Sequence, residues 1–229
     1  MIFDPVYFIM IAPAFLLSLY AQFKVKSSYS KYSKVSTSRG ITGAKAAYEI
    51  LRSEGITDVD IELSRGFLSD HYDPTKKVLR LSEAVYHGDS LASVGVAAHE
   101  VGHAIQHARG YMPLQLRSAL VPISSVGSNL AWPLLIIGFI LSVKSLLLAG
   151  IIFFTLAVIF QLITLPVEFN ASSRALQALP ATGILFGEEV VGAKKVLSAA
   201  ALTYVAAAVS AVMQLLYFVM RAGLLGGDE

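Results

Sequence analysis

Four long stretches without charged residues dominate the pattern along the chain. They cover residues 5–23, 118–143, 145–167 and 196–220 and contain 19, 26, 23 and 25 residues. Because an α-helix rises 1.5 Å per residue, each stretch is long enough to cross a hydrocarbon core of about 30 Å. The sequence therefore predicts about four transmembrane helices, with the second and third joined by a tight hairpin at Lys144.

The segment between the first two stretches has a different pattern. Residues 24–117 carry 13 Lys or Arg and 10 Asp or Glu. Apolar residues at helical spacing predict a helix over 43–53, and alternating residues on both sides of Asp73-Pro74-Thr75 predict a strand–turn–strand unit. A second helix should start after the capping residue Ser90 and stop at Gly110. These elements predict a small α+β domain.

The composition excludes several classes of protein and of metal site. The chain of 229 residues is 55% hydrophobic and only 15% charged, against roughly 25% charged in a soluble domain. Its formal charge of +2 gives no field that indicates a nucleic-acid partner. The absence of cysteine excludes disulfides and thiolate metal sites. Any metal must therefore be held by other ligands, and all five histidines fall between His71 and His107.

The distribution of lysine and arginine predicts the orientation in the membrane. Residues 24–39 contain five basic residues and no acidic one, and the segment 166–195 adds three more basic residues. By the positive-inside rule both segments lie in the cytoplasm. The 24–117 domain and the 166–195 loop should therefore share the cytoplasmic side.

The second predicted helix contains the motif His99-Glu100-Val101-Gly102-His103, an H-E-x-x-H pattern. Residues four apart lie on one helical face, so both imidazoles can reach one zinc ion with Glu100 beside it. In such sites zinc lowers the pKa of its water and the glutamate accepts the proton. The alternative, a helix that buries these groups without partners, is costly. His107 lies too far along the helix to share the ion and is better placed to interact with the helix C-terminus.

A catalytic zinc needs a third protein ligand from elsewhere in the chain. The leading candidate is Glu168, which follows the third apolar stretch and is predicted to lie on the same side of the membrane as the motif helix. Its alternative role is an interfacial charge that closes the span, although a carboxylate at that depth usually has a function. Glu188 and Glu189 are the fallback ligands.

Several other polar residues have weaker indications. His71, His87, Tyr86 and Arg174 could stabilise an oxyanion or line a cleft, but structural roles are at least as well supported. For His71 that role is a polar cluster that organises the turn. The KVLRLS strand is expected, by analogy with zincin folds, to offer a sheet edge at which a peptide adds as a further strand.

The run LSDHYDPTKKVLRLSEAVYHGDSLASVGVAAHEVGHAIQHA resembles the signature of the YugP-like neutral zinc metallopeptidases, a family of small bacterial membrane proteins. The resemblance implies zinc binding by His99 and His103 and catalysis by Glu100. The segment from Glu168 is more loosely similar to the Glu-x-x-Ala-Asp motif of the HtpX-type membrane gluzincins, with Ser172 in place of the aspartate. Asn170 or Ser172 could then orient a zinc-bound histidine through a hydrogen bond.

These observations together predict a mostly α membrane protein with a small α+β zincin-like catalytic domain. The expected division is a first span over 1–23, the catalytic domain over 24–117, two spans over 118–167, a zinc-completing loop or helix over 168–195 and a last span over 196–229.

The expected function is zinc-dependent cleavage of membrane-proximal or unfolded polypeptides at the bacterial cytoplasmic membrane. The expected partners are the lipid bilayer and a polypeptide, with no nucleic acid, and a homo-oligomer is left open. The alternative from another class is a non-catalytic zinc-binding scaffold or adaptor. A structural zinc, however, usually has four protein ligands, commonly including cysteine. Cleavage within the lipid is disfavoured because the motif precedes the second span.

Overall fold

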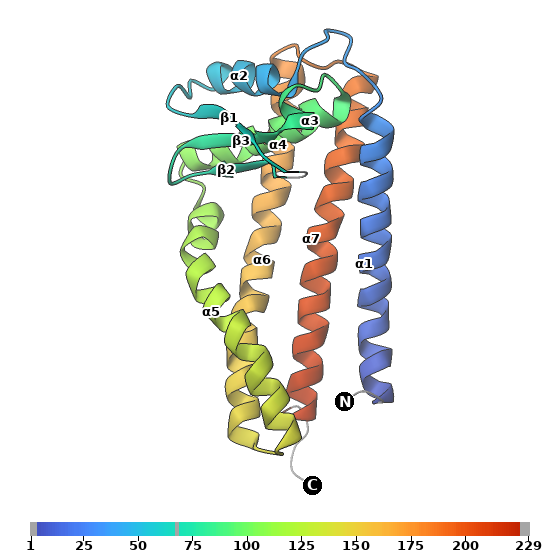
Figure 1. The fold of residues 1–229 in the computed structure, drawn as a ribbon, viewed down its shortest axis with the longest axis vertical. Coiled ribbons are helices and arrows are strands. Elements are labelled where there is room, and N and C mark those ends of the chain that lie inside the picture. Colours follow the sequence, from blue (N-terminus) through green and yellow to red (C-terminus); the bar gives the residue numbers. More distant parts are fainter. Residues whose placement is uncertain (1–3, 67–68, 225–229) are drawn as a thin grey trace. The chain divides into compact units, whose positions relative to one another are not determined.

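The structure, a computed structural model, describes residues 4–66 and 69–224 (Figure 1). Four of its helices are long and apolar enough to cross a membrane: α1 (Pro5–Tyr32), α5 (Met112–Ile140), α6 (Lys144–Ala181) and α7 (Glu188–Arg221). This finding confirms the predicted mostly α membrane protein with about four spans. The hairpin also lies where expected, because α5 ends just before α6 begins at Lys144.

The chain divides into two compact units. The apolar unit contains Met1–Ala21, Gln115–Leu165 and Thr203–Glu229, as far as these are described, and the mixed unit contains Gln22–Leu114 and Pro166–Leu202. The core of the apolar unit is built around Phe218, whose ring packs edge-on against Phe154 and Trp132 at centroid distances of 5.4 and 5.9 Å. Such aromatic pairs stabilise the packing beyond the area that they bury.

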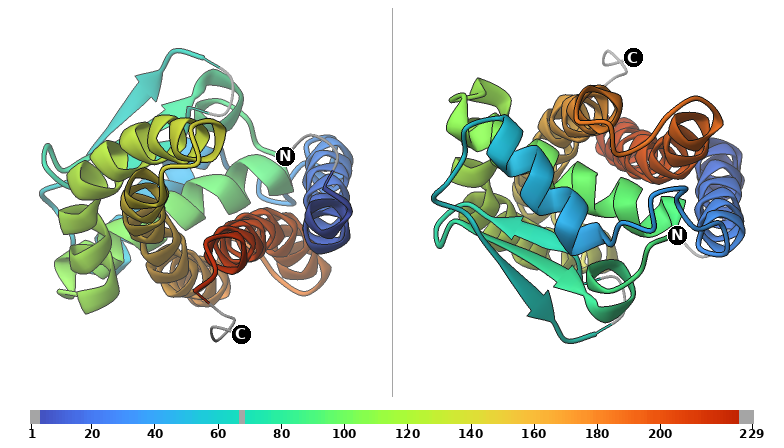
Figure 2. Two further views of the ribbon diagram at one scale, coloured as in Figure 1. Left: turned by 90° about the horizontal axis from the view of Figure 1, so that it is seen from below. Right: turned by 90° about the horizontal axis from the view of Figure 1, so that it is seen from above.

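The mixed unit holds a three-stranded sheet and three shorter helices. The strands are β1 (Asp60–Ser64), β2 (His71–Asp73) and β3 (Val78–Ser82), and the helices are α2 (Gly43–Ser53), α3 (Glu83–Tyr86) and α4 (Leu91–Ala108). Both predicted helices are present, with Thr42 capping α2 and Ser90 capping α4 through their side-chain oxygens. Figure 2 shows the sheet alongside α2 and α4. The predicted α+β domain is therefore confirmed.

The order of the strands corrects one expectation. The sheet runs β1-β3-β2, with β3 parallel to β1 and antiparallel to β2. The KVLRLS segment forms β3, so it is the central strand and offers no edge. Its backbone pairs with β1 on one side and with β2 on the other, and its Leu79 and Leu81 are fully buried in the core shared with α2 and α4. The outer edges of the sheet belong to β1 and β2.

The segment expected as a loop or helix after Glu168 is mostly helical. Helix α6 continues past this residue to Ala181, and α7 begins at Glu188, so only residues 182–187 form the connection. Ala171, Ala175 and Ala178 are buried in this extension. Their helical spacing buries one face in the core of the mixed unit, which stabilises the continuation of the helix.

Helices α4 and α6 approach each other most closely at a glycine. A Cβ atom added to Gly102 of α4 would lie 2.4 Å from the carbonyl oxygen of Ala171 in α6. This contact is with backbone, which cannot rotate away as a side chain can. The absence of a side chain at Gly102 is therefore a condition for the two helices to pack at this distance.

Gly102→Ala should destabilise the protein by about 1–3 kcal/mol, the usual cost of overpacking, because the added methyl group pushes α6 away from α4. The matched control is Gly95→Ala in the same helix, where the nearest atom to the new Cβ would be the Ala193 Cβ at 3.5 Å, an ordinary van der Waals contact. That substitution should be neutral or slightly stabilising, since alanine favours a helix. Thermal unfolding of the purified full chain measures both, and equal unfolding temperatures for the two variants would contradict the packing argument.

Candidate metal centre

Three side chains that the sequence singled out converge in the mixed unit. His99 and His103 lie one turn apart on α4, and Glu168 reaches them from α6. The Glu168 Oε2 lies 3.2 Å from the His99 Nε2 and 3.7 Å from the His103 Nε2. One ligand atom from each residue lies within 4.8 Å of the others. We call this group the three-ligand cluster.

The chemistry of the three-ligand cluster fits a divalent metal. Two imidazole nitrogens and one carboxylate oxygen form the donor set of open zinc sites. Glu168 is only 2% exposed and His103 only 8%, so the carboxylate has little access to water. Burying such a charge is expensive unless a cation balances it. A metal ion at this point would satisfy all three groups.

The electrostatic field at His103 also favours a cation. Burial lowers the pKa of the imidazole, but its hydrogen bond to Glu168 and the negative charges of Glu100 and Glu168 outweigh burial and raise the pKa above its ordinary value. A field that stabilises a proton on this ring stabilises any positive charge placed there. The negative charges of Glu100 and Glu168 therefore favour a metal ion next to His103.

Hydrogen bonds orient both imidazoles with Nε2 toward Glu168. The Nδ1 of His99 lies 3.1 Å from the Ser172 hydroxyl, and the Nδ1 of His103 lies 3.0 Å from the Gln106 Oε1. The Gln106 amide nitrogen donates to the carbonyl oxygen of Val167 at 2.8 Å. The Val167 carbonyl oxygen can only accept, so the Gln106 amide nitrogen must face Val167 and the Gln106 Oε1 must face His103. Because this Oε1 also only accepts, the Nδ1 of His103 must carry the proton. The Nε2 is then free to bind a metal.

Ser172 and Asn170 thus occupy the two positions that the sequence suggested for orienting a histidine. Ser172 contacts His99 directly, whereas Asn170 acts through Gln106, whose Nε2 donates to the Asn170 Oδ1 at 3.0 Å. The Arg174 Nε donates to the same oxygen at 2.7 Å. Arg174 therefore supports this network and is not one of the three clustered ligands.

Glu100 is fixed beside the cluster by the sheet. The backbone N–H of Tyr72, in the edge strand β2, donates to the Glu100 Oε2 at 3.1 Å. The Tyr72 hydroxyl lies 2.8 Å from the His107 Nδ1, so the same residue contacts α4 twice. Burial and the nearby Asp58 and Asp73 raise the pKa of Tyr72 to about 12. Its phenol therefore stays protonated, and its hydrogen bond with His107 joins β2 to α4 outside the cluster, where His107 was expected to lie.

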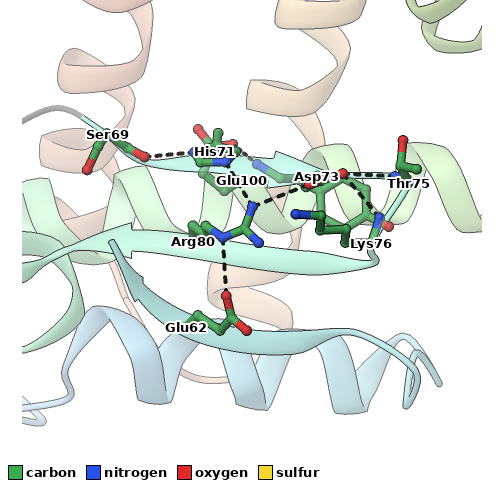
Figure 3. Close-up of polar contacts among 9 residues, drawn as sticks. Glu62, Ser69, His71, Asp73, Thr75, Lys76, Arg80 and Glu100 are labelled. Atoms are coloured by element: carbon green, nitrogen blue, oxygen red, sulfur yellow. Dashed lines mark hydrogen bonds and ion pairs between the residues drawn. The ribbon is translucent and has the colours of Figure 1, made fainter. Parts of the chain in front are cut away.

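His71 lies in a polar network on the strands (Figure 3). Its Nδ1 is 2.8 Å from the Ser69 carbonyl oxygen and its Nε2 is 3.4 Å from the Arg80 Nη1. Arg80 also pairs with Glu62 at 3.1 Å and with Asp73 at 3.3 Å. This network joins the three strands, which agrees with the structural role weighed for His71.

The remaining candidates lie outside the three-ligand cluster. Glu189 accepts from the backbone N–H groups of Ser38 at 2.6 Å and Phe186 at 3.2 Å, and so holds the start of α7. Glu188, the other fallback ligand, is exposed, and the rings of Tyr86 and His87 pack against each other at 4.9 Å. Among the described residues, only His99, His103 and Glu168 form a group that could hold a metal ion.

Comparison with known proteins agrees with this site. Residues 7–223 match the model of a family described as "Putative neutral zinc metallopeptidase". The chain belongs to this family. It is also 54% identical over 213 residues to the "Putative membrane protease YugP" of Bacillus subtilis (strain 168), covering 93% of this chain and 94% of that protein. No solved structure matches the chain.

The sequence singled out neither Tyr72, which holds Glu100, nor Gln106. Gln106 is the residue that contacts a candidate ligand. It is fully buried and joins His103 to the Val167 carbonyl and the Asn170 side chain. A signal was present, because Gln106 lies three residues after His103 and residues at that spacing face the same way on a helix. A buried amide next to a metal-binding motif is therefore worth testing as a positioning residue.

Gln106→Ala should weaken zinc binding by about 10–100-fold, the usual effect of losing a partner that orients a metal ligand. The control is Gln177→Ala, which removes an exposed glutamine that bonds to Ser173 on α6 and should leave the affinity unchanged. Competition with a chelator of known affinity measures both constants. Wild-type affinity in a folded Gln106→Ala protein would show that this amide does not position His103.

Proposed function

We propose that this membrane protein is a zinc metalloendopeptidase of the gluzincin type, with His99, His103 and Glu168 as zinc ligands and Glu100 as the general base. The observation that carries the proposal is the convergence of the three ligand atoms within 4.8 Å, with Glu100 fixed next to them by the Tyr72 backbone. Only three protein ligands converge among the described residues, which is typical of catalytic zinc with an open position.

Each residue has a distinct part in this reaction. Zinc, when bound, supplies a Lewis acid that polarises a peptide carbonyl and acidifies water. The Tyr72 N–H holds the Glu100 Oε2, so the other carboxylate oxygen is available to take the proton of the attacking water. Glu100 then delivers that proton to the leaving amine. Gln106 keeps His103 in the tautomer that binds through Nε2, and the Ser172 hydroxyl can accept from the Nδ1–H of His99 so that its Nε2 also faces the metal. No covalent bond to the protein forms.

The substrate peptide, in this proposal, lies beside β2 instead of the central β3. β2 is an edge strand and contacts α4 through the Tyr72–Glu100 bond. Strand addition at this edge would bring a peptide alongside the general base. An ion pair of 3.3 Å between Arg80 of β3 and Asp73 of β2 helps to hold β2 in place.

The proposed substrates are membrane-proximal or unfolded polypeptides on the cytoplasmic side of the bacterial cytoplasmic membrane. Glu168 belongs to the same helix as the apolar stretch 145–167, and it follows that stretch directly in the sequence. The basic residues of 24–39 support the cytoplasmic orientation.

Glu168→Gln should lower zinc affinity by more than about 100-fold, since losing a ligand costs more than losing a supporting bond. Glu188→Gln is the matched control, because this exposed carboxylate of α7 was a fallback ligand and its loss should change nothing. Zinc content after dialysis and the competition constant are the readouts. Equal zinc binding by both variants would remove Glu168 from the ligand set.

Glu100→Gln should keep zinc and lose hydrolysis of a quenched, unfolded polypeptide by about 100-fold to 10,000-fold, the contribution of a positioned general base. The full chain in detergent is compared with Glu83→Gln, an exposed control on α3 that should retain activity. Chelation should abolish the wild-type activity and added zinc should restore it. If wild type and Glu100→Gln bind zinc equally and neither cleaves, the non-catalytic scaffold is favoured.

A further inference from the structure

A groove of about 690 Å³ lies between one face of α1 and one face of α7, entirely within the mixed unit. We call it the basic groove, because four lysines line it together with serine hydroxyls. Its polar lining residues include Lys24, Ser27, Lys31, Lys194, Lys195 and Ser198. It shares none of its lining residues with the three-ligand cluster. The metal centre does not account for it.

The spacing of these residues along α1 and α7 places them on the two helix faces that line the groove. On α1, Lys24 and Lys31 are seven residues apart, which places them two turns apart on the same face. On α7, Lys194 and Ser198 are four residues apart and likewise share a face. At one end α7 meets α1 closely, because a Cβ on Gly192 would lie 3.1 Å from the Tyr32 ring. That contact fixes the two walls of the groove.

The groove concentrates positive charge without neutralising it. No acidic residue lines it, and within residues 4–66 and 69–224 no ion pair involves any of its four lysines. Two lysines elsewhere do pair with a carboxylate, since Lys77 pairs with Asp58 and Lys45 lies 4.0 Å from Glu49. Four cations around one hollow repel one another unless an anion occupies it. The serine hydroxyls can donate to the same anion.

The sequence places this charge at the ends of two apolar stretches. Lys24 directly follows the stretch 5–23, and Lys195 directly precedes the stretch 196–220. Residues at such junctions lie at the depth of lipid headgroups. The lining also includes Ala199 and Leu202, which follow Lys195 within the apolar stretch and offer apolar surface next to the charged groups. A free anion needs no such surface, whereas the first carbons of an acyl chain do.

We propose that the basic groove binds the phosphodiester headgroup of an anionic phospholipid, with the lysines and serines around the phosphate and the apolar residues along the start of the acyl chains. The lipid is a bound ligand at a defined site between α1 and α7. Binding of the lipid does not depend on peptide hydrolysis, so this proposal can be tested separately from the proposed function.

The test measures binding of dioleoylphosphatidylglycerol to the detergent-purified full chain by native mass spectrometry. Lys31→Gln/Lys194→Gln should raise the apparent Kd by about tenfold to thirtyfold, since each of the two lysines near an anionic headgroup contributes roughly threefold to fivefold. The matched control is Lys26→Gln/Lys34→Gln, which removes two exposed lysines outside the groove and should change the Kd less than about twofold. Lys31→Arg/Lys194→Arg should retain binding.

Two further ligands distinguish an anionic lipid from a zwitterionic lipid and from a soluble phosphate ester. Dioleoylphosphatidylcholine should bind weakly and equally to all variants, and glycerol 3-phosphate should not displace the lipid. Equal losses in the groove and control variants would show a diffuse charge effect and overturn the proposal. Groove-dependent binding of glycerol 3-phosphate would overturn it in favour of a soluble phosphate ester. If the first variant unfolds, Lys24→Gln/Lys195→Gln removes the other two lysines and must meet the same criteria.

Discussion

The backbone contact between Gly102 and Ala171 is the constraint on which the candidate metal centre depends. Gly102 lies between the two histidines of the motif and directly precedes His103, and Ala171 lies one turn after Glu168. A side chain at the contact would separate α4 from α6 and draw the carboxylate away from the imidazoles. The Val167 carbonyl and Asn170 flank the same contact and bind Gln106. The approach of two backbones thus sets the ligand distances and also the orientation of His103.

The sheet contributes to the site through one residue of its shortest strand. Tyr72 holds Glu100 with its backbone and His107 with its hydroxyl, so β2 is attached to α4 at two points two turns apart. Pairing with β3, and the Arg80–Asp73 ion pair across the two strands, keep this short strand in place. An edge strand of three residues would be unstable alone. Its attachment to the helix and to the central strand explains how it can position a reacting group.

Local features of the sequence could be predicted because local physics determines them. The capping oxygen of Ser90, the spacing of His99 and His103, and the length of the apolar stretches each act within one element. Glu168 could be predicted as the third ligand from its position directly after an apolar stretch. The order of the strands could not, since it depends on contacts between Leu79, Leu81 and distant helices. Gln106 was missed for a similar reason, because its acceptors lie on α6, 61 and 64 residues away.

The division of the site along the chain has a consequence for its assembly. His103 and Glu168 are separated by α5 and by the apolar part of α6. The segment 24–117, which contains the H-E-x-x-H motif, lacks Glu168, the Ser172 partner of His99 and both acceptors of Gln106. An excised soluble domain would expose the apolar face of α4 and hold two imidazoles without their carboxylate. The three candidate ligands therefore come together only when the part of α6 that follows its apolar stretch packs against α4.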